Sequence, residues 1–412
     1  MSIAQAIDEK RLWQRHMDLG SIGATEKGGV NRQAFTDEET QARKLLFDWA
    51  TSRGFSCAVD DFGNLFFRRA GTDPDAEPIV TGSHIDSQPT GGKFDGAYGV
   101  LAGLEVLEAA EDAGIKTRRP LEFVAWTNEE GGRFQPATMG SGVYVGAMDY
   151  EAMLDVADRK GVTIRQLMPA TLAATPNAER RPFGTRFAAY IEAHIEQGPI
   201  LEMEEKTIGV VTGIQGCRWF AIEVTGSEAH AGTTPFAARK DAFRAAHAMI
   251  AEMQEMTADE TDTTRFTVGC FEVSPGSPNT VPGHVFFTVD LRHPDAATLK
   301  DFGDRLYEIC KRNAQGLGVK VKETYSVPPI SFHKDVVECV RDSTRSLSLS
   351  HRDIISGALH DAKYMNDICP SGMIFVPCEK GISHNEVEAA SPSDLAAGAR
   401  VLAEAMIALA NQ

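Results

Sequence analysis

Histidines and acidic residues stand where several apolar runs of this sequence end, and these residue types bind metals and move protons. The runs and their polar residues are "EPIVTGSHID" with His84, "LEFVAWTNEEGG" with Glu129 and Glu130, and "FAAYIEAHIEQG" with His194, while Asp95 lies in a glycine-rich loop and His384 follows "SGMIFVPCEKG". A mixed set of histidine, aspartate and glutamate is typical of a site for one or two divalent metals.

The neighbours of these residues suggest how such a site would work. Two nearby metals need a bridging carboxylate, for which Asp95 is the candidate. Asp86, two residues beyond His84, could accept the second N–H of that histidine. Glu129 and Glu130 are adjacent, so in an extended strand they point to opposite sides. One can then bind metal while the other serves as general base for a water whose pKa the metal lowers to about 7.

Each of these residues also has a purely structural interpretation. A single histidine at a strand end is usually structural, and a Glu-Glu pair is usually a solvated face. A glycine-rich loop can be a tight turn that needs positive φ. What favours a metal site is that the candidate ligands all fall at expected strand ends or in the loops that follow them.

The elements that would position these residues alternate between strand and helix. Residues 77–86 and 121–132 are expected to form buried strands, and 100–114 carries an apolar stripe at helical spacing. Residues 187–198 and 371–381 are further strand candidates. This order predicts right-handed crossovers and a mainly parallel sheet covered by helices. Ligands of such sheets bind beyond the carboxyl ends of the strands, where the candidate residues stand.

The region from about Gly213 to Pro329 has a different pattern. Its strand and helix signals follow the order β-α-β-β-α-β, which is typical of a ferredoxin-like α+β sandwich. We therefore expect an α/β catalytic domain made of residues 1–212 and 330–412, with a smaller domain inserted at 213–329. The segment 148–185 has helical and loop-like character, and the sequence does not place it.

Composition limits the classes of function. The chain has 412 residues, a formal net charge of −17, and the balance of 42% hydrophobic and 24% charged residues of a globular protein. The acidity argues against nucleic acid or an anionic membrane as partner. Motifs of nucleotide-binding loops and of nucleophilic serine esterases are absent. We find no signal peptide, no membrane span and no C-x-x-C among scattered cysteines, so we expect a cytoplasmic protein with reduced thiols.

Several longer motifs are more specific than these spacings. They are "GSHIDSQPTGGKFDG", "TNEEGGRF", "IEAHIEQGPILE", "HAGTTPFAARKDA", "PNTVPG", "DLRHPD", "SGALHDA" and "GISHNEVE". With these motifs the chain, from about residue 20 to its C-terminus, resembles the zinc-peptidase-like amidohydrolases of the M20 superfamily. More narrowly, it is similar to the hydantoinase/carbamoylase branch, which contains N-carbamoyl-L-amino acid hydrolases, β-ureidopropionases and allantoate amidohydrolases.

The resemblance implies two divalent metal ions, with Zn expected first and Mn, Co or Ni as alternatives that N/O ligands also accept. One ion would be held by His84, Asp95 and His194, and the other by Asp95, Glu130 and His384. Asp86 would be the hydrogen-bonding partner of His84, and Glu129 would be the general base.

The resemblance also implies residues that bind substrate. His230 would stabilise the tetrahedral intermediate, often from the partner subunit of a homodimer formed through the inserted domain. Asn279 and Arg292 would bind the substrate carboxylate, for which a guanidinium offers a bidentate fork. Gln197 would contact the carbamoyl or amide end, and the backbone near Leu359 would complete the carboxylate pocket. Closure of the inserted domain as a lid would exclude water.

Two positions depart from the family pattern. Gln88 stands where Val is common, and Leu359 stands where Gly is frequent, so the pocket beside the carboxylate could be reshaped. The expected function is hydrolysis of a linear, non-peptide C–N bond in a carboxylate-bearing small molecule, such as an N-carbamoyl α- or β-amino acid. Alternatives are allantoate hydrolysis, N-acyl-amino-acid or dipeptide hydrolysis, and, in a different class, a non-catalytic metal-bound scaffold.

Overall fold

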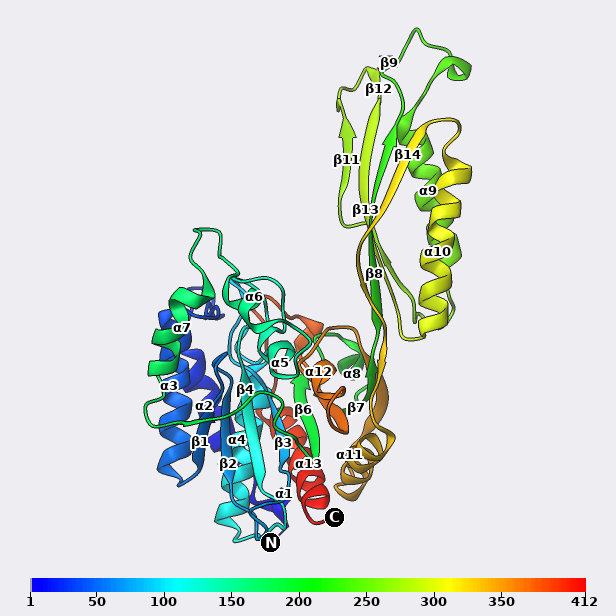
Figure 1. The fold of residues 1–412 in the computed structure, drawn as a ribbon. Coiled ribbons are helices and arrows are strands. Elements are labelled where there is room, and N and C mark those ends of the chain that lie inside the picture. Colours follow the sequence, from blue (N-terminus) through cyan, green and yellow to red (C-terminus); the bar gives the residue numbers. More distant parts are fainter. Residues whose placement is uncertain (1) are drawn as a thin grey trace. The chain divides into compact units, whose positions relative to one another are not determined.

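The computed structural model describes residues 2–412 and divides into two compact units. The first, unit 1, combines the chain up to Thr212 with Phe332–Gln412, and the second, unit 2, is Gly213–Ser331. The sequence places the second boundary at Pro329, within two residues of the observed one. Each unit has its own main sheet (Figure 1).

Unit 1 is a mixed α/β structure whose central strands are parallel. These are β17 (Ser371–Val376), β6 (Ala189–Ile195), β3 (Ile79–His84) and β4 (Leu121–Trp126), in this order across the sheet. Antiparallel pairing then adds β2 (Leu65–Arg69) and β1 (Ser56–Val59) beside β4, and β7 (Ile208–Ile214) beside β17. The short strands β5 (Glu179–Arg180) and β16 (His351–Ser356) complete the sheet of unit 1. The short strand β15 (Ile330–Ser331), the last two residues of unit 2, pairs with the end of β7 at Gly213 and Ile214. The expected mainly parallel central sheet is therefore present.

The helix α4 (Ala97–Asp112) lies at the centre of unit 1. Almost its whole surface is buried, because it packs on β3 and is covered in turn by α2 (Glu9–Gly20) and α13 (Pro392–Ala410). Its glycines permit close contact with the sheet, since a Cβ at Gly103 would lie 2.6 Å from Phe123. The buried surface of this helix is mostly apolar, and its buried Glu105 and Glu108 are paired with Arg11 and Arg15 of α2.

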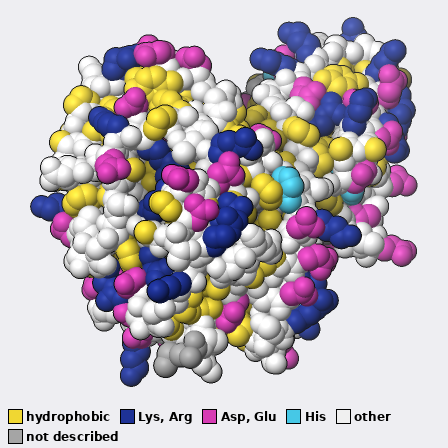
Figure 2. Space-filling model, turned by 60° about the horizontal axis from the view of Figure 1, so that its bottom comes forward, with side chains coloured by type: hydrophobic (Ala, Val, Ile, Leu, Met, Phe, Trp, Pro, Cys, Tyr) yellow, Lys and Arg dark blue, Asp and Glu magenta, His cyan; other side chains and the backbone are white. Residues whose placement is uncertain are grey.

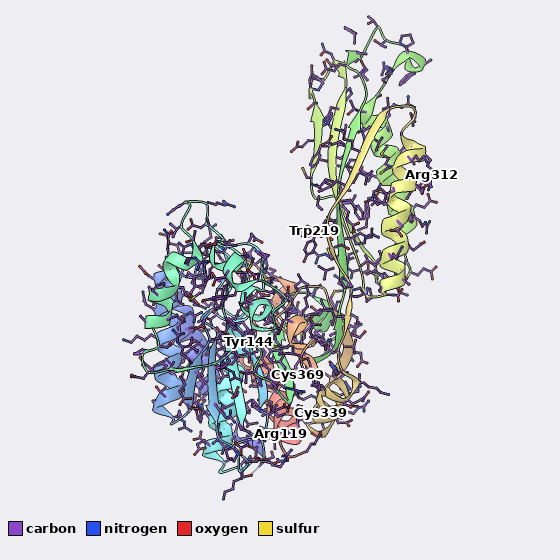
Figure 3. All side chains as sticks on the ribbon, viewed as in Figure 1. Arg119, Tyr144, Trp219, Arg312, Cys339 and Cys369 are labelled. Atoms are coloured by element: carbon purple, nitrogen blue, oxygen red, sulfur yellow. The ribbon has the colours of Figure 1, made fainter. Side chains whose placement is uncertain are left out.

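The remaining helices of unit 1 complete its layers and edges. They are α1 (Ile3–Ala6), α3 (Asp37–Ser52), α5 (Met139–Tyr144), α6 (Tyr150–Leu154), α7 (Ile164–Ala173), α8 (Ile200–Met203), α11 (Lys334–Ser346) and α12 (Ala362–Met365). The segment that the sequence does not place contains α6, α7 and β5, and its apolar side chains form a separate cluster with Phe35, Phe62 and Phe134. Tyr144, labelled in Figure 3, packs against Phe66 and Trp126.

Unit 2 has an antiparallel sheet with helices packed on it. The strand order is β10-β13-β8-β14, and β11 also pairs with β13. The bounds are β8 (Gly216–Thr225), α9 (Ala242–Thr257), β10 (Arg265–Thr267), β11 (Phe271–Ser274), β13 (His284–His293), α10 (Ala296–Asn313) and β14 (Gly318–Val327). A separate ribbon joins β9 (Ala229–His230) to β12 (Thr280–Val281). Alternate residues of β13 are buried, and they pack with α9 and α10 in a hydrophobic core that belongs to unit 2.

The surface carries charged side chains of both signs (Figure 2). On the face drawn in Figure 2, basic and acidic side chains are interspersed rather than gathered by sign. Among the helices formed by residues 2–412, none is both long and apolar enough to cross a membrane.

Candidate metal centre and active site

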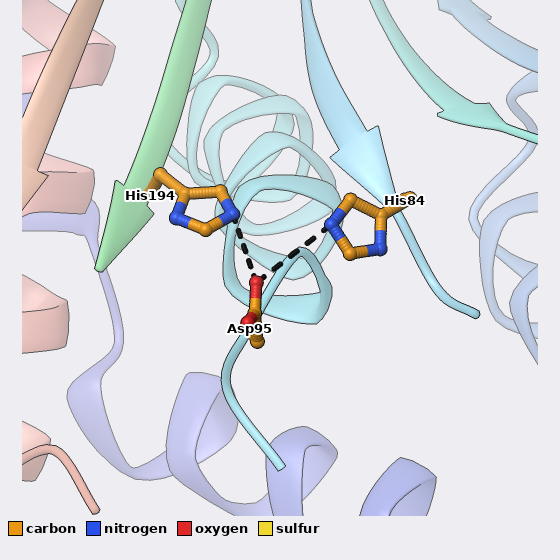
Figure 4. Close-up of side chains that lie close together, drawn as sticks. All are labelled: His84, Asp95 and His194. Atoms are coloured by element: carbon orange, nitrogen blue, oxygen red, sulfur yellow. Dashed lines mark ion pairs between the residues drawn. The ribbon is translucent and has the colours of Figure 1, made fainter. Parts of the chain in front are cut away.

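Two histidines and an aspartate converge at the carboxyl edge of the parallel strands. Nε2 of His194 lies 3.2 Å from Oδ1 of Asp95, and Nε2 of His84 lies 3.8 Å from the same oxygen (Figure 4). His84 ends β3, His194 lies near the end of β6, and Asp95 lies in the loop before α4. All of them are buried, and their ligand atoms lie within 4.8 Å of one another, close enough to share one metal ion.

Main-chain carbonyls orient both imidazoles toward Asp95. Nδ1 of His84 lies 2.9 Å from the carbonyl oxygen of Asp86, and Nδ1 of His194 lies 2.9 Å from that of Ile195. With Nδ1 engaged in this way, Nε2 of each ring is left to face the aspartate, as a metal ligand requires. Gly96 makes room for the His84 ring: its φ is +64°, and a Cβ there would lie 2.2 Å from that ring.

A second group of potential ligands shares Asp95 with the first. Nε2 of His384 lies 3.6 Å from Oδ2 of Asp95 and 3.3 Å from Oε2 of Glu130. Asp95 therefore offers one oxygen to each group, as a bridging ligand would. Oδ2 of Asp95 also accepts hydrogen bonds from Nε2 of Gln197, at 2.9 Å, and from Oγ of Ser383, at 2.8 Å.

The carboxylate of Asp86 holds the chain that carries the two glutamates. It accepts hydrogen bonds from the backbone N–H groups of Glu129 and Glu130, both at 3.2 Å. Its nearest oxygen is 3.8 Å from Nδ1 of His84, so the ring N–H donates instead to the main-chain carbonyl of Asp86. Oε2 of Glu129 lies 3.5 Å from Nε2 of His84, which places a carboxylate beside the first group of ligands.

The electrostatics of the site favour a bound cation. Burial and the neighbouring carboxylates raise the pKa of Glu129 and of Glu130 well above the usual range. Burial also raises the pKa of Asp86 to about 7. Burial alone would raise the pKa of Asp95 as well, but the contact with His194 and the nearby histidine charges outweigh it and lower that pKa.

Divalent metal ions fit this donor set. Within residues 2–412, every ion pair made by Asp86, Asp95, Glu129 and Glu130 is with a histidine, and none is with Lys or Arg. Divalent ions would relieve the repulsion between these buried carboxylates while binding N and O ligands of suitable type.

Three further candidate residues lie in unit 2. His230 and Asn279 are exposed neighbours on the β9–β12 ribbon, where the Asn279 carbonyl accepts the N–H of Ala231 at 2.9 Å. Nδ1 of His230 accepts the N–H of Gly232 at 3.0 Å. Arg292 lies near the C-terminal end of β13, where its Nη2 donates to Oδ2 of Asp290 at 2.8 Å.

Other residues contact the site although the sequence motifs gave them no role. Glu388 accepts the backbone N–H groups of Phe94 and Asp95 at 2.9 and 3.0 Å, and thereby fixes the loop that carries Asp95. Glu388 and Ser383 both lie in "GISHNEVE", so proximity to His384 was the available signal. Leu359 lies in the loop between β16 and α12, directly before the buried His360.

Fold and site together define a class: mixed α/β proteins that gather histidines and carboxylates, which are ligands of divalent metals, at the carboxyl edge of a mainly parallel sheet. Comparison with known proteins identifies the family within that class. Residues 80–408 match the family described as peptidase family M20/M25/M40. The chain belongs to this family.

Similar proteins extend over almost the full chain. An N-carbamoyl-L-amino-acid amidohydrolase of Rhizobium meliloti is 41% identical, with 98% of this chain and 97% of that protein aligned. An allantoate amidohydrolase of Escherichia coli is 33% identical, with 99% and 98% aligned. A hydantoinase/carbamoylase family amidase of Burkholderia multivorans has a similar crystal structure, with a TM-score of 0.95, 47% identity and 98% of each chain covered. The resemblance inferred from the sequence motifs is confirmed.

Proposed function

We propose that this protein is a metal-dependent amidohydrolase that removes the carbamoyl group of an N-carbamoyl amino acid. The observation that carries the proposal is the pair of ligand groups that share Asp95, with Glu129 beside them. The names of the relatives support the amidohydrolase class, and the relative at 41% identity is an N-carbamoyl-L-amino-acid amidohydrolase.

Two divalent ions would be held by the ligand groups already described. His84, Asp95 and His194 would hold one ion, and Asp95, Glu130 and His384 would hold the other. When bound, such ions activate water and stabilise negative charge that develops on a carbonyl oxygen. Zn suits the mixed N/O donors, as do Mn, Co and Ni.

Glu129 is the proposed proton carrier. Its Oε2 lies 3.5 Å from Nε2 of His84, so its carboxylate is within reach of a water held beside the first group of ligands. It takes a proton from the attacking water as the water oxygen bonds to the carbamoyl carbon. It then donates that proton to the amino nitrogen as the C–N bond breaks. The products are the amino acid and carbamic acid, which decomposes to CO2 and ammonia.

Gln197 is the proposed contact for the carbamoyl end. Its Nε2 donates to Asp95, while its Oε1 is buried and has no hydrogen-bond partner among residues 2–412. A buried amide oxygen without a partner is costly. The N–H group of a carbamoyl or amide substrate would satisfy it.

The geometry of unit 2 supports a role for a second subunit. His284 and Arg292 are eight residues apart on β13, which corresponds to about 27 Å of strand. His230 and Asn279 belong to the β9–β12 ribbon, which is attached at the His284 end of β13. There the N–H of Gly226, which follows β8, donates to the carbonyl oxygen of Gly283, which follows β12, at 2.8 Å.

One small substrate cannot reach both ends of this strand. We therefore propose that His230 and Asn279 serve the site of the other subunit in a homodimer, whereas Arg292 binds the substrate carboxylate. The backbone near Leu359 completes that pocket, and unit 2 acts as lid and dimerisation domain.

A substrate panel tests the activity. Ammonia and amine release would be measured with N-carbamoyl-L-amino acids, N-carbamoyl-β-alanine, allantoate, an N-acetyl amino acid and a dipeptide, after chelation and after adding back Zn, Mn, Co or Ni. Ammonia from a carbamoyl amino acid that depends on metal supports the proposal. Turnover of allantoate alone, or amine without ammonia from the last two compounds, would move the protein to a neighbouring activity. Metal binding without turnover of any compound would favour a scaffold.

Adjacent substitutions test the division of roles. Glu129→Gln should lower kcat by on the order of 10²- to 10⁴-fold while leaving metal content unchanged, because only a proton carrier is lost. Glu130→Gln, the matched control, should lower metal content as well. Full activity in Glu129→Gln would refute the general-base role.

A further inference from the structure

Gln88 contacts the carboxylate of Glu130 from both its side chain and its main chain. Its Nε2 donates to Oε2 of Glu130 at 2.9 Å and to the Glu130 carbonyl oxygen at 3.1 Å. Its backbone N–H donates to Oε1 at 3.2 Å. One residue therefore fixes both carboxylate oxygens, while Nε2 of His384 lies 3.3 Å from Oε2.

The first group of ligands is held in another way. Both of its histidines, His84 and His194, are oriented by main-chain carbonyls, so their orientation depends on no single neighbouring side chain. Glu130 is different, because Asp86 fixes only its backbone N–H and the carboxylate end is held by Gln88. A glutamate has several rotatable bonds, and ordering such a side chain has an entropic cost that a fixed hydrogen bond reduces.

We propose that Gln88 is a positioning residue that sets the affinity of the second metal position, formed by Asp95, Glu130 and His384, without setting that of the first. The inference rests on the proposed function, which supplies the two metal positions. Partners that orient a ligand commonly change metal affinity by about 10- to 100-fold when they are removed. Because the hydrogen bonds of Gln88 go to Glu130 and to neither histidine of the first group, the loss should be confined to one of the two binding steps.

The test compares Gln88→Met with the wild-type protein. Methionine has similar length but lacks the amide donor. Stepwise Zn binding would be measured by competition with a chromophoric chelator, and total metal by elemental analysis after dialysis. We expect two ions per wild-type chain, and in Gln88→Met a second step weakened about 10- to 100-fold with the first step unchanged.

Gln135→Met is the matched control. The amide of Gln135 lies in the same loop region and donates to the carbonyl oxygen of Gly131 rather than to a carboxylate of the site. Both binding steps of this variant should match those of the wild type. Thermal unfolding of the metal-free proteins would show that the variants fold. If Gln88→Met does not fold, Gln88→Asn, whose amide is one methylene shorter, should show the same selective loss.

Each result has a definite meaning. Two unchanged binding steps in a folded Gln88 variant would overturn the inference and leave the proposed function intact. Equal weakening of both steps would also overturn it, since the effect would then be general. A wild-type protein that binds fewer than two ions would refute the two-metal part of the proposed function, and the positioning role would fall with it.

Discussion

His16, on α2, is a fully buried histidine outside the candidate metal centre. Its ring packs against those of Phe94 and Tyr98, with centroids 5.3 and 6.1 Å away. Burial lowers the pKa of His16 from 6.5 to about 3, because the fold disfavours the charged ring. The stability that the neutral ring contributes is therefore complete above pH 6.5 and is lost as the pH falls toward 3.

Replacement of His16 by leucine should remove this sensitivity to acid. Between pH 6.5 and 5, the metal-free wild-type protein should lose about 2 kcal/mol more stability than His16→Leu, from the linkage of protonation to folding. Urea unfolding at several pH values measures the difference. His247→Leu, at an exposed position of α9, should keep the wild-type profile. If the free energy of unfolding falls in parallel with pH for the wild type and for His16→Leu, His16 is not the cause of the loss of stability in acid.

Residue types in the candidate site could be predicted from the sequence, but the atoms that meet could not. Asp86 is close to His84 in the sequence, which predicts a contact between its carboxylate and the ring. In the structure the carboxylate of Asp86 accepts the backbone N–H groups of Glu129 and Glu130, and the main-chain carbonyl of Asp86 orients the His84 ring. Gln197 likewise uses one end of its amide on Asp95. These contacts depend on side-chain torsions and loop paths, which residue spacing does not determine.

At the scale of elements, glycines with positive φ flank both ends of α4, yet their surroundings differ. Gly96, with φ +64°, lies against the His84 ring, whereas a Cβ added at Gly114, with φ +63°, would meet no atom within 4 Å. Gly114→Ala should therefore cost about 1 kcal/mol of stability from backbone strain alone. Gly96→Ala should in addition displace His84 and lose Zn binding at the first position. Metal titration and urea unfolding of both variants separate the effects, and equal metal affinity in the two would contradict the expected clash.

The alternating strands and helices of unit 1 could be predicted because they have regular periodicity. The parallel strands β3, β4 and β6 and the helix α4 lie where the sequence predicts them. The antiparallel neighbour β2 and the short β5 could not be recognised, since their positions are set by pairing with β4 and β1. Residues 148–185 could not be placed because their apolar side chains pack with residues distant in sequence, such as Phe35 and Phe134.

At the scale of the whole molecule, the two units differ in what a metal can stabilise. Every proposed metal ligand lies in unit 1. Unit 2 has a core of its own, in which Leu306 of α10 is fully buried. A ligand that binds only folded protein stabilises it by about 2.7 kcal/mol at 100 times Kd. This free energy should act on unit 1 alone if the units unfold independently.

Calorimetry of the full chain should therefore show two unfolding transitions, of which only one responds to metal. Zn at 100 times Kd should raise the transition of unit 1 by several degrees, and a chelator should reverse this. Leu306→Ala should lower only the other transition, because a cavity in a packed core costs about 2–5 kcal/mol. This variant assigns each transition to its unit without dividing the chain. A single transition that shifts with both metal and Leu306→Ala would show instead that the two cores unfold as one cooperative structure, and that binding in unit 1 is transmitted to unit 2.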